Sequence, residues 1–583
     1  MRLKIVKIIY FSLLFFIVVR LFYWQMIRFD DMSALAEAQH LKVSSLSAPR
    51  GLILSKDGGI YTTNKPVYSL FATPGFIKDK KAVASELADV FASEDFKKTL
   101  TDNHLTVDTE NPVYQKLLTS YKDDILSKLN QKLDWIALKY NIELRVKLNI
   151  DKLKIDGLGF EETSARLYPE ASSAAHILGF VGSDELGNQK GYFGIEGYYD
   201  RQLRGVKGEV TEEKDADGLP ILLGRFLQQD AKKGYELTLN IDRSVQYIVE
   251  KKLKAGIIKF GAKSGSVVIM DPKTGAILAM ATLPNYDPND YTNYLKSSFK
   301  NPIVADTYEP GSTFKTLIMA AGINEKVVTP ETICDECQGP VEIGEYKIRT
   351  WDNEYRKNET MQEVITQSDN TGMVFVGKKL GENKLYEYIQ KFGIGEPTKI
   401  DLEDEISSDL RLKKDWKEID YATATFGQGI AVTPIQMVRA IAAIANKGYL
   451  LEPHVVKSIN MNNKVTEIKP KIVGQPISEE TAQTVKNMMV EAVDKGEAGS
   501  YAPKNYKIAG KTGTAQIPIA GHYDPTKTVA SFVGFAPADN PKFIMLVRYD
   551  EPSSSIYGTS TAAPTFFEIA NELFSYYQII PDR

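Results

Sequence analysis

A serine and a lysine that stand three positions apart are the residue types from which a nucleophile could be built. Pro310-Gly311 interrupts any preceding helix, and Ser312-Thr313-Phe314-Lys315 follows it. Residues i and i+3 share one face of a helix, so the amine of Lys315 can reach the hydroxyl of Ser312. That hydroxyl becomes a nucleophile when a base removes its proton. A lysine serves as a base when burial or a second cation keeps it neutral. The same spacing also fits an ordinary N-cap at Ser312 followed by a solvated Lys315.

A second candidate segment is Ser368-Asp369-Asn370, which follows the helical stretch Met361–Gln367 and precedes Thr371-Gly372. The hydroxyl of Ser368 could relay a proton, because a hydroxyl both donates and accepts hydrogen bonds. The amide of Asn370 could hold a lysine and a substrate amide at once. Taken alone, the triplet also fits a simple turn that ends a helix.

A third segment, Lys511-Thr512-Gly513-Thr514, lies in a strand-like run. A cation and two hydroxyls along one strand suit the recognition of a substrate carboxylate. Gly513 has no side chain, so an acyl chain could lie against the strand backbone there, as in β-augmentation. Lys511 would also be the second cation that keeps Lys315 neutral. The alternative is a surface strand with a glycine bulge.

The order of the three motifs along the chain is more informative than any one of them. Ser-x-x-Lys, Ser-x-Asn and Lys-Thr-Gly, in this order, are the set used by serine β-lactamases and penicillin-binding proteins. The five histidines are scattered, which argues against a Ser-His-Asp triad. The sequence therefore predicts an acyl-serine enzyme. Its predicted catalytic residues are Ser312, Lys315, Ser368, Asn370 and Lys511, and its predicted substrate-binding residues are Thr512, Gly513 and Thr514.

The elements that must position these motifs begin near residue 236. A turn at Asp271–Gly275 joins two strand-like runs into a predicted hairpin, and three further strand-like runs come late in the chain. The simplest assembly is an α+β fold with a five-stranded, mainly antiparallel sheet and helices packed on it. The predicted strands are Ser266–Met270, Ala276–Ala281, Tyr506–Ala515, Val529–Ala536 and Phe543–Tyr549, and the main predicted helices are Ser244–Ile257, Thr313–Asn324, Pro434–Asn446, Glu479–Asp494 and Thr565–Tyr577.

Residues 29–235 carry no chemical motif and are predicted to form a mixed, non-catalytic region. Ala48–Leu54 looks like a strand that ends in a turn at Asp57-Gly58-Gly59. Residues 77–150 have helical periodicity in places, such as Val113–Leu138. The predicted domains are residues 1–28, the cytoplasmic tip and membrane anchor, residues 29–235, a pedestal, and residues 236–583, the catalytic domain.

The N-terminal segment is long and apolar enough to be a membrane anchor. Ile8–Ile27 would span about 30 Å as a helix, which matches the hydrocarbon core of a bilayer. Basic residues precede this run and aspartates follow it, so the positive-inside rule places the tip in the cytoplasm and the rest outside. The alternative is a cleaved signal peptide with its cleavage site at Ala34-Leu35-Ala36. The length of the run favours a retained anchor, and thus a single-pass protein of the cytoplasmic membrane.

Arg20 interrupts the apolar run and has two explanations. It could snorkel toward the outer headgroups, or it could contact a helix of another membrane protein. Both stay open at the level of the sequence.

Length and composition limit the class of protein. The chain has 583 residues, so at least two folded units are expected. Hydrophobic residues make up 43% and charged residues 25%, and the net charge of −4 gives no electrostatic footprint for nucleic acid. Cys334 and Cys337 are the two cysteines, and a zinc site would need two more ligands nearby. A small-loop disulfide and two unreacted thiols both stay open.

With these motifs in place, the sequence resembles the class B penicillin-binding proteins, the monofunctional peptidoglycan transpeptidases of bacterial division and elongation. The resemblance covers nearly the whole chain except residues 77–150. Besides the anchor and the three motifs, it is carried by Arg50-Gly51, Arg166-Leu167-Tyr168-Pro169, Ala175–Gly179, Gly194-Ile195-Glu196-Gly197, Tyr308-Glu309-Pro310-Gly311, Gly427-Gln428-Gly429 and Thr433-Pro434.

The resemblance implies an elongated pedestal for dimerisation or partner binding and a β-lactamase-like transpeptidase domain. The implied substrate is a peptidoglycan stem peptide that ends in D-Ala-D-Ala. Ser312 would attack the penultimate carbonyl, and the backbone N–H groups of Ser312 and Thr514 would form the oxyanion hole. Lys511, Thr512 and Thr514 would bind the terminal carboxylate. β-Lactam antibiotics would acylate Ser312 as substrate mimics.

The resemblance also implies the partners. The amine of a neighbouring stem peptide would accept the acyl group, and no metal or organic cofactor would be needed. A membrane glycan polymerase of the division or elongation machinery would bind the anchor and pedestal. His176 would be structural. The chain length and the simple anchor favour division over elongation by analogy only.

Other functions stay open. A hydrolase of the same fold, either a β-lactamase or a carboxypeptidase, would share the three motifs, although the pedestal and the retained anchor argue against a free β-lactamase. A non-enzymatic scaffold that recruits division proteins is less consistent with three intact motifs. A penicillin sensor would need a cytoplasmic signalling region, and none is recognisable.

Overall fold

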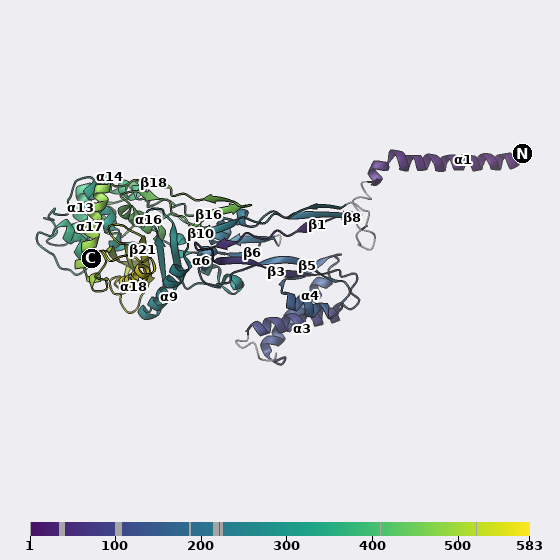
Figure 1. Ribbon diagram of the computed structural model, residues 1–583, viewed down its shortest axis with the longest axis horizontal. Helices are drawn as coiled ribbons and strands as arrows, with labels where there is room; N and C mark the ends of the chain where they lie inside the picture. The colour runs from purple at the N-terminus through teal and green to yellow at the C-terminus, as the bar shows by residue number, and fades with distance from the viewer. Residues whose placement is uncertain are drawn as a thin grey trace. The chain divides into compact units, whose positions relative to one another are not determined.

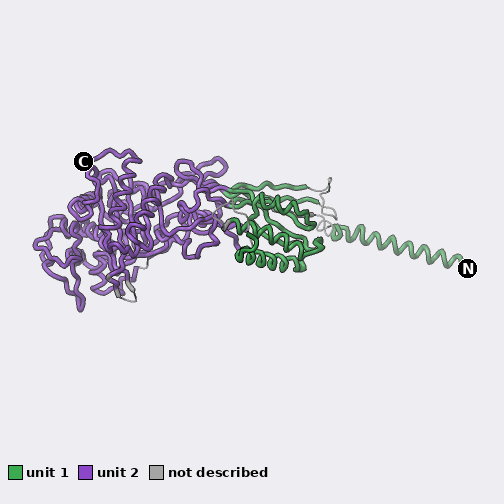
Figure 2. Tube along the Cα trace, turned by 90° about the horizontal axis from the view of Figure 1, so that it is seen from below, with its two compact units in different colours: residues 1–50, 64–165, 204–234 green, residues 51–63, 166–203, 235–583 purple. Residues whose placement is uncertain are grey.

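The computed structural model describes residues 2–33, 41–99, 108–185, 188–213, 221, 226–408, 410–519 and 522–583. They form two compact units, coloured separately in Figure 2, and both units are discontinuous in sequence. Unit 1 comprises residues 1–50, 64–165 and 204–234, and unit 2 comprises residues 51–63, 166–203 and 235–583. The predicted domain boundaries at residues 28 and 235 stay a prediction, because compact units are defined by contacts and not by chain order.

Unit 2 is built around the predicted five-stranded sheet. In order across the sheet, its strands are β12 (Ile277–Leu283), β11 (Ser264–Met270), β21 (Phe543–Asp550), β20 (His522–Ala536) and β19 (Ala509–Ile519). Every neighbouring pair is antiparallel, which confirms the expected topology. β19 is an edge strand and carries Lys511 opposite Val533 of β20. The third motif therefore lies at the rim of a rigid sheet.

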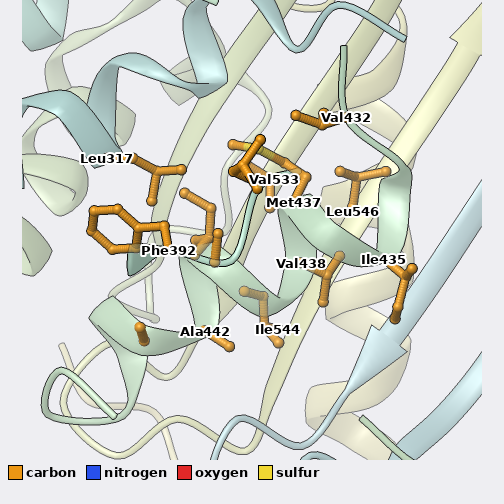
Figure 3. Close-up of a cluster of buried hydrophobic side chains, with 14 of the residues drawn as sticks. Leu317, Phe392, Val432, Ile435, Met437, Val438, Ala442, Val533, Ile544 and Leu546 are labelled. Carbon is orange, nitrogen blue, oxygen red and sulfur yellow. The ribbon is translucent and has the colours of Figure 1, made fainter. Parts of the chain in front are cut away.

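Four long helices cover this sheet, namely α9 (Arg243–Phe260), α11 (Lys315–Asn324), α16 (Pro434–Ala445) and α18 (Ala562–Tyr576). Successive side chains of a strand point to opposite faces. Val547 of β21 therefore packs in one core with α9 and α18, which lie together in Figure 1. Its neighbour Leu546 packs in the other core with α11 and α16, beside Val533 (Figure 3). Because helices cover both faces of the sheet, the sequences of its strands are nearly continuous apolar runs.

The sequence at the start of α16 shows why the helix begins where it does. Thr433 is the N-cap, and its hydroxyl accepts a hydrogen bond from the backbone N–H of Gln436 at 3.2 Å. The side chain of Gln436 accepts one from the N–H of Thr433 at 2.9 Å, which completes a capping box. Pro434 occupies the first helical position, where no N–H partner is needed.

The other elements of unit 2 are short. A second sheet joins β10 (Glu236–Leu239) to β2 (Ile53–Leu54), β16 (Val456–Met461) and β17 (Lys464–Glu467). The remaining helices are α6 (Ala175–Leu178), α7 (Gly194–Tyr198), α8 (Asp200–Leu203), α10 (Pro302–Ala305), α12 (Met361–Gln367), α13 (Asn370–Leu380), α14 (Glu382–Lys391), α15 (Glu418–Ala424) and α17 (Glu479–Lys495). The remaining strand pairs are β6 (Phe180–Ser183) with β7 (Gln189–Tyr192), β13 (Val341–Ile343) with β14 (Tyr346–Ile348), and β15 (Leu450–Leu451) with β18 (Ile472–Gly474).

Unit 1 holds a three-stranded sheet, further paired strands and a helical lobe. The three-stranded sheet has the order β1 (Leu41–Leu46), β8 (Gly208–Glu213), β9 (Phe226–Gln229). In addition, β3 (Ile60–Ala72), most of which lies in unit 1, pairs with β4 (Ile136–Ile142) and β5 (Leu158–Leu167). Apolar side chains of these strands share a core with α3 (Lys80–Thr99), α4 (Pro112–Leu129) and α5 (Leu144–Asp151).

Three predicted elements differ from the structure. The helical pattern of Val113–Leu138 was extended too far, because α4 ends at Leu129 and β4 begins at Ile136. Residues 130–134, four of which are polar, separate the two elements, after which buried Ile136 and Leu138 alternate with half-buried Ala137 and Lys139 as in a strand. The predicted strand Ala48–Leu54 is reduced to the two residues of β2.

The predicted helix Thr313–Asn324 also begins later than expected. A 3₁₀ turn, Gly311–Thr313, comes first, and α11 begins at Lys315. The tighter turn follows from the positive φ of 54° at Gly311, which an α-helix does not contain.

The N-terminal helix α1 (Arg2–Phe22) continues as a π-helical turn, Tyr23–Ile27. Leu3–Ile27 is long and apolar enough to cross a membrane, by length and composition. Its apolar side chains are exposed, as in a helix that meets lipid. This fits a single-pass membrane protein. The alternative cleavage site Ala34-Leu35-Ala36 lies outside the described residues.

Cys334 and Cys337 form a disulfide, the first of the two explanations, with their Cα atoms 5.6 Å apart. Both side chains are buried. The N–H of Cys334 donates to the carbonyl of Glu359 at 2.8 Å, so the disulfide loop is tied to the segment that begins α12.

Candidate active site

Ser312 lies in the middle of the 3₁₀ turn that precedes α11. The N–H of Gly311 donates to the carbonyl of Gly427 at 3.0 Å, which joins the turn to the Gly427-Gln428-Gly429 loop. A Cβ atom at Gly311 would lie 3.0 Å from the carbonyl oxygen of Thr514. The turn is thus fixed between a loop and the edge strand β19, and Ser312 stays half-buried at the surface of the cleft.

Lys315 is 0% exposed and points its amine at the second motif. Its Nζ lies 2.6 Å from the carbonyl oxygen of Ser368, 2.8 Å from Asn370 Oδ1 and 3.3 Å from Ser368 Oγ. Burial holds the pKa of Lys315 well below its usual range, and the charge of Lys511 lowers this pKa further. A neutral Lys315 can accept a proton from Ser368 Oγ while it donates to the other two oxygens.

Lys315 makes no hydrogen bond to Ser312 within the part of the chain that the structure describes. Its partners are all on the second motif, and the nearest hydroxyl is that of Ser368. Catalytic hydrogen bonds are often long or absent before substrate binds. The arrangement therefore makes Ser368 the hydroxyl in contact with the base.

The corner between α12 and α13 presents Ser368 and Asn370 to Lys315. Ser368 has a left-handed backbone, with φ of 62°, and is the C-cap of α12. Asp369 is the N-cap of α13, and its side chain accepts from the N–H of Gly372 at 3.0 Å. Asn370 Nδ2 donates to the carbonyl of Arg349 at 2.8 Å, which fixes its Oδ1 toward Lys315. The helix-ending turn that the sequence indicates is thus the segment that presents the candidate relay, Ser368, to Lys315.

Lys511 is buried at the edge of the sheet, and its Nζ donates to Thr512 Oγ1 at 3.2 Å. Burial lowers the pKa of Lys511 to about 8, although Glu497 acts in the opposite direction. Thr514 Oγ1 accepts from the N–H of Gly558 at 3.0 Å. The strand therefore offers one cation and two hydroxyls to the cleft.

The structure gives a different reason for Gly513 than the one expected. A Cβ atom at this position would lie 2.5 Å from Ser531 Oγ, 2.9 Å from Thr313 Cγ2 and 3.0 Å from the carbonyl oxygen of Pro310. The missing side chain lets the Gly311–Thr313 turn, called the nucleophile turn below because it carries Ser312, pack directly on β19. Contact of a substrate with the backbone of Gly513 stays a prediction.

A cleft of about 630 Å³ brings the predicted residues together. Ser312, Ser368, Asn370, Lys511, Thr512 and Thr514 line it, whereas Lys315 and Gly513 lie behind its wall. Trp351 and Tyr557 also line it, with ring centroids 6.1 Å apart, and no sequence pattern predicted either of them. Gln428 lines it too and belongs to a segment that carried the resemblance.

His176 is not on the lining of the cleft. It is buried, and its Nε2 lies 3.0 Å from the carbonyl oxygen of Ser298. Burial lowers its pKa to about 4, so the ring is neutral. This is the environment of a structural histidine.

Comparison with known families agrees with this geometry. Residues 265–572 match the model described as the penicillin-binding protein transpeptidase domain, and residues 45–239 match that of the penicillin-binding protein dimerisation domain. The chain belongs to the class B penicillin-binding proteins. The predicted family, the predicted enzyme class and the predicted fold class of a class B penicillin-binding protein are thereby confirmed. The roles of individual side chains stay predictions.

Relatives of this class B penicillin-binding protein match it over most of their length. Stage V sporulation protein D of Bacillus subtilis is 32% identical over 570 residues, which cover 97% of this chain and 84% of the relative. Peptidoglycan D,D-transpeptidase FtsI of Escherichia coli is 28% identical over 573 residues, which cover 97% and 90%. The crystal structure of a peptidoglycan synthetase from Bifidobacterium adolescentis matches with a TM-score of 0.71 at 26% identity, covering 93% of this chain and 98% of that one.

Proposed function

We propose that this protein is a membrane-anchored peptidoglycan D,D-transpeptidase that carries its acyl group on Ser312. One observation supports the assignment most directly. The buried amine of Lys315 contacts Ser368 and Asn370, beside a cleft that also holds Ser312 and Lys511. A nucleophile, a base that burial keeps neutral and a cation for a carboxylate are the groups that acyl transfer from a D-Ala-D-Ala peptide requires.

The first half-reaction forms the acyl-enzyme. Ser312 Oγ attacks the penultimate carbonyl carbon while its proton passes to Lys315. The backbone N–H groups of Ser312 and Thr514 stabilise the oxyanion. The bond from the carbonyl carbon to the terminal D-Ala nitrogen breaks, and the proton returns through Lys315 and Ser368 to the leaving amine. Lys511 holds the terminal carboxylate, together with the hydroxyls of Thr512 and Thr514.

The second half-reaction transfers the acyl group from Ser312 to an acceptor. The amine of a neighbouring stem peptide attacks the acyl carbon, the bond to Ser312 Oγ breaks, and a proton returns to that oxygen. Water in place of the amine would give hydrolysis. Muropeptides made in cells that express the protein distinguish the two acceptors. Cross-linked products are expected, and exclusively trimmed peptides would contradict transpeptidation.

The same proposal covers location and partners. The helix Leu3–Ile27 anchors the chain in the cytoplasmic membrane, with its bulk outside the cell. A membrane glycan polymerase of the division or elongation machinery would supply the strands to be cross-linked. Localisation of a tagged protein to midcell or along the side wall separates division from elongation.

Fluorescent penicillin tests the nucleophile directly. The wild-type protein is expected to form a covalent adduct, because a β-lactam mimics the D-Ala-D-Ala end. Ser312→Ala removes the only oxygen that the proposal makes nucleophilic, so it should give no labelled band. Ser120→Ala, at an exposed position of α4, is the matched control and should label like wild type. An unlabelled wild-type protein, or a labelled Ser312→Ala, would refute the assignment.

A further inference from the structure

Glu359 is a buried carboxyl group that the proposed mechanism does not use. It is 2% exposed, and Asp369 of the second motif is 1% exposed. The two carboxyl groups interact with each other, although α12 separates them in sequence. A pair of buried carboxyl groups directly behind the Ser368–Asn370 corner needs an explanation, because buried charges are costly unless they are paired.

The hydrogen bonds around the pair determine where its proton lies. Asp369 Oδ1 accepts from Thr371 Oγ1 at 2.7 Å and from the N–H of Gly372 at 3.0 Å. Asp369 Oδ2 and both carboxyl oxygens of Glu359 are buried, and no N–H or hydroxyl group of the described residues donates to them. Two carboxylates cannot bond to each other without a proton. Asp369 already accepts two hydrogen bonds, whereas neither oxygen of Glu359 accepts one from a described residue, so we place the shared proton on Glu359.

We propose that Glu359 is a positioning residue of the catalytic centre, whose protonated carboxyl donates to Asp369 Oδ2 and so holds the Ser368–Asn370 corner against Lys315. This inference rests on the proposed function for its catalytic consequence. Its structural part, a protonated Glu359 that donates to Asp369, stands independently. Asp369 caps α13, and the residues on either side of it supply all three oxygens that contact Lys315 Nζ.

The charges around Glu359 agree with a neutral carboxyl. Burial raises the pKa of Glu359, and the negative charge of Asp369 raises it further. Glu363 acts in the same direction, while Arg356 opposes both. Lys315 also interacts with both carboxyl groups of the pair.

The proton on Glu359 also helps to keep Lys315 in the neutral form that can act as a base. The carboxyl groups of Asp369 and Glu359 both act to raise the pKa of Lys315, against burial and Lys511. An ionised Glu359 would add a second negative charge near Lys315 and favour its protonated form, which cannot take a proton from Ser312. Holding the pair at a single charge therefore keeps Lys315 neutral.

A purely structural role for Glu359 makes different predictions. Its backbone carbonyl accepts from Cys334 N, and it precedes Thr360, the N-cap of α12. Any residue supplies that carbonyl. Substitutions at the side chain therefore separate the two roles. Glu359→Gln keeps the size and a donor but cannot ionise, whereas Glu359→Leu keeps the size and removes the donor.

Infrared spectroscopy of the full-length protein in detergent tests the proton itself. At about pH 7, an ordinary glutamate is ionised. Wild type should show a protonated-carboxyl band that Glu359→Gln lacks and that Glu345→Leu, at an exposed position of the β13–β14 hairpin, retains. This measurement does not depend on acylation. Absence of the band from wild type would overturn the proposal even where penicillin labels Ser312.

The rate of acylation by penicillin tests the catalytic consequence. Near neutral pH, Glu359→Gln should stay within about threefold of wild type, and Glu359→Leu should fall about 10- to 100-fold, because Asp369 Oδ2 is left without a donor. Above neutral pH, Glu359 of the wild-type protein loses its proton, and the acylation rate of the wild type should decline. The ratio of the Glu359→Gln rate to the wild-type rate should therefore rise with pH. A constant ratio across pH would overturn the proposal. So would Glu359→Leu with the wild-type rate. If Glu359→Leu does not fold, the ratio for Glu359→Gln still decides.

Discussion

Two buried lysines lie at the cleft, Lys511 in its lining and Lys315 behind its wall, and the proposed mechanism needs them in different charge states. In that mechanism, Lys315 must be neutral to take a proton from Ser312, whereas Lys511 must be charged to hold a carboxylate. Burial lowers the pKa of both, but Lys511 also lowers the pKa of Lys315, and Glu497 supports the charge on Lys511. The difference between their surroundings agrees with the two proposed roles, as in other sites where the surroundings drive the pKa values of neighbouring groups apart.

The pH dependence of acylation should be bell-shaped for this reason. The rate should rise with pH as Lys315 loses its proton, and fall above about pH 8 as Lys511 loses its own. Arginine stays charged across this range. In Lys511→Arg the acylation rate should therefore decline less at alkaline pH, and the decline that remains should be the one that ionisation of Glu359 causes. Its rate at neutral pH should fall about tenfold, an effect of about 1.4 kcal/mol, because the guanidinium is larger. Stopped-flow measurement of penicillin acylation across pH checks the profile.

Lys507→Arg is the matched control, since Lys507 lies in the segment just before β19 and pairs with Asp539. It should leave the profile unchanged. An alkaline decline that is as steep in Lys511→Arg as in wild type would show that Lys511 does not set it.

At the scale of elements, the site depends on the contact between the nucleophile turn and the edge strand β19. Gly311 packs on the carbonyl of Thr514, and Gly513 packs on Thr313 and Pro310. These contacts place Ser312 beside the hydroxyls of the strand. Glycine is required on both partners because their backbones approach too closely for a Cβ atom.

Gly513→Ala should separate the two elements. Its Cβ would meet Ser531 Oγ at 2.5 Å and Thr313 Cγ2 at 2.9 Å, so the strand or the turn must shift. Overpacking of this kind costs about 1–3 kcal/mol, and we expect penicillin acylation to slow about 10- to 100-fold with a lowered melting temperature. Gly474→Ala, on β18, has nothing within 4 Å and should behave like wild type. Wild-type acylation by Gly513→Ala would contradict the role of this contact.

The sequence predicted the elements whose pattern is local and missed those that depend on distant partners. The five strands follow from apolar runs and turn residues, and the structure confirms all of them. Strand β4 was missed because no glycine or proline between α4 and β4 marks the end of the helix. The three motifs predicted the lining of the cleft, since their residue types are chemically distinctive. Glu359 gave no signal, because only folding around α12 brings it to Asp369.

At the scale of the whole molecule, the chain has two compact units, one of which includes a helix long and apolar enough to cross a membrane. The transpeptidase match lies within unit 2, whereas the dimerisation match draws on segments of both units. Under the proposed function, the chemistry is confined to unit 2, and the anchor would determine on which side of a membrane it acts. A transpeptidase of peptidoglycan has its substrate outside the cytoplasm, so the orientation of the anchor is itself a functional requirement.

The charges before the anchor should determine that orientation. Positive residues near a membrane helix stay in the cytoplasm, and the effect is limited to about 15–20 residues from its ends. Alkaline phosphatase fused after Arg583 folds only outside the cytoplasm and should be active. Replacing Arg2, Lys4 and Lys7 by glutamate should lower that activity severalfold, because the positive charges that keep the N-terminal tip in the cytoplasm are then lost. The same reversal at Lys78, Lys80 and Lys81, beyond the reach of the rule, should leave it unchanged. Equal activity in both triple variants would show that the basic tip does not orient the anchor.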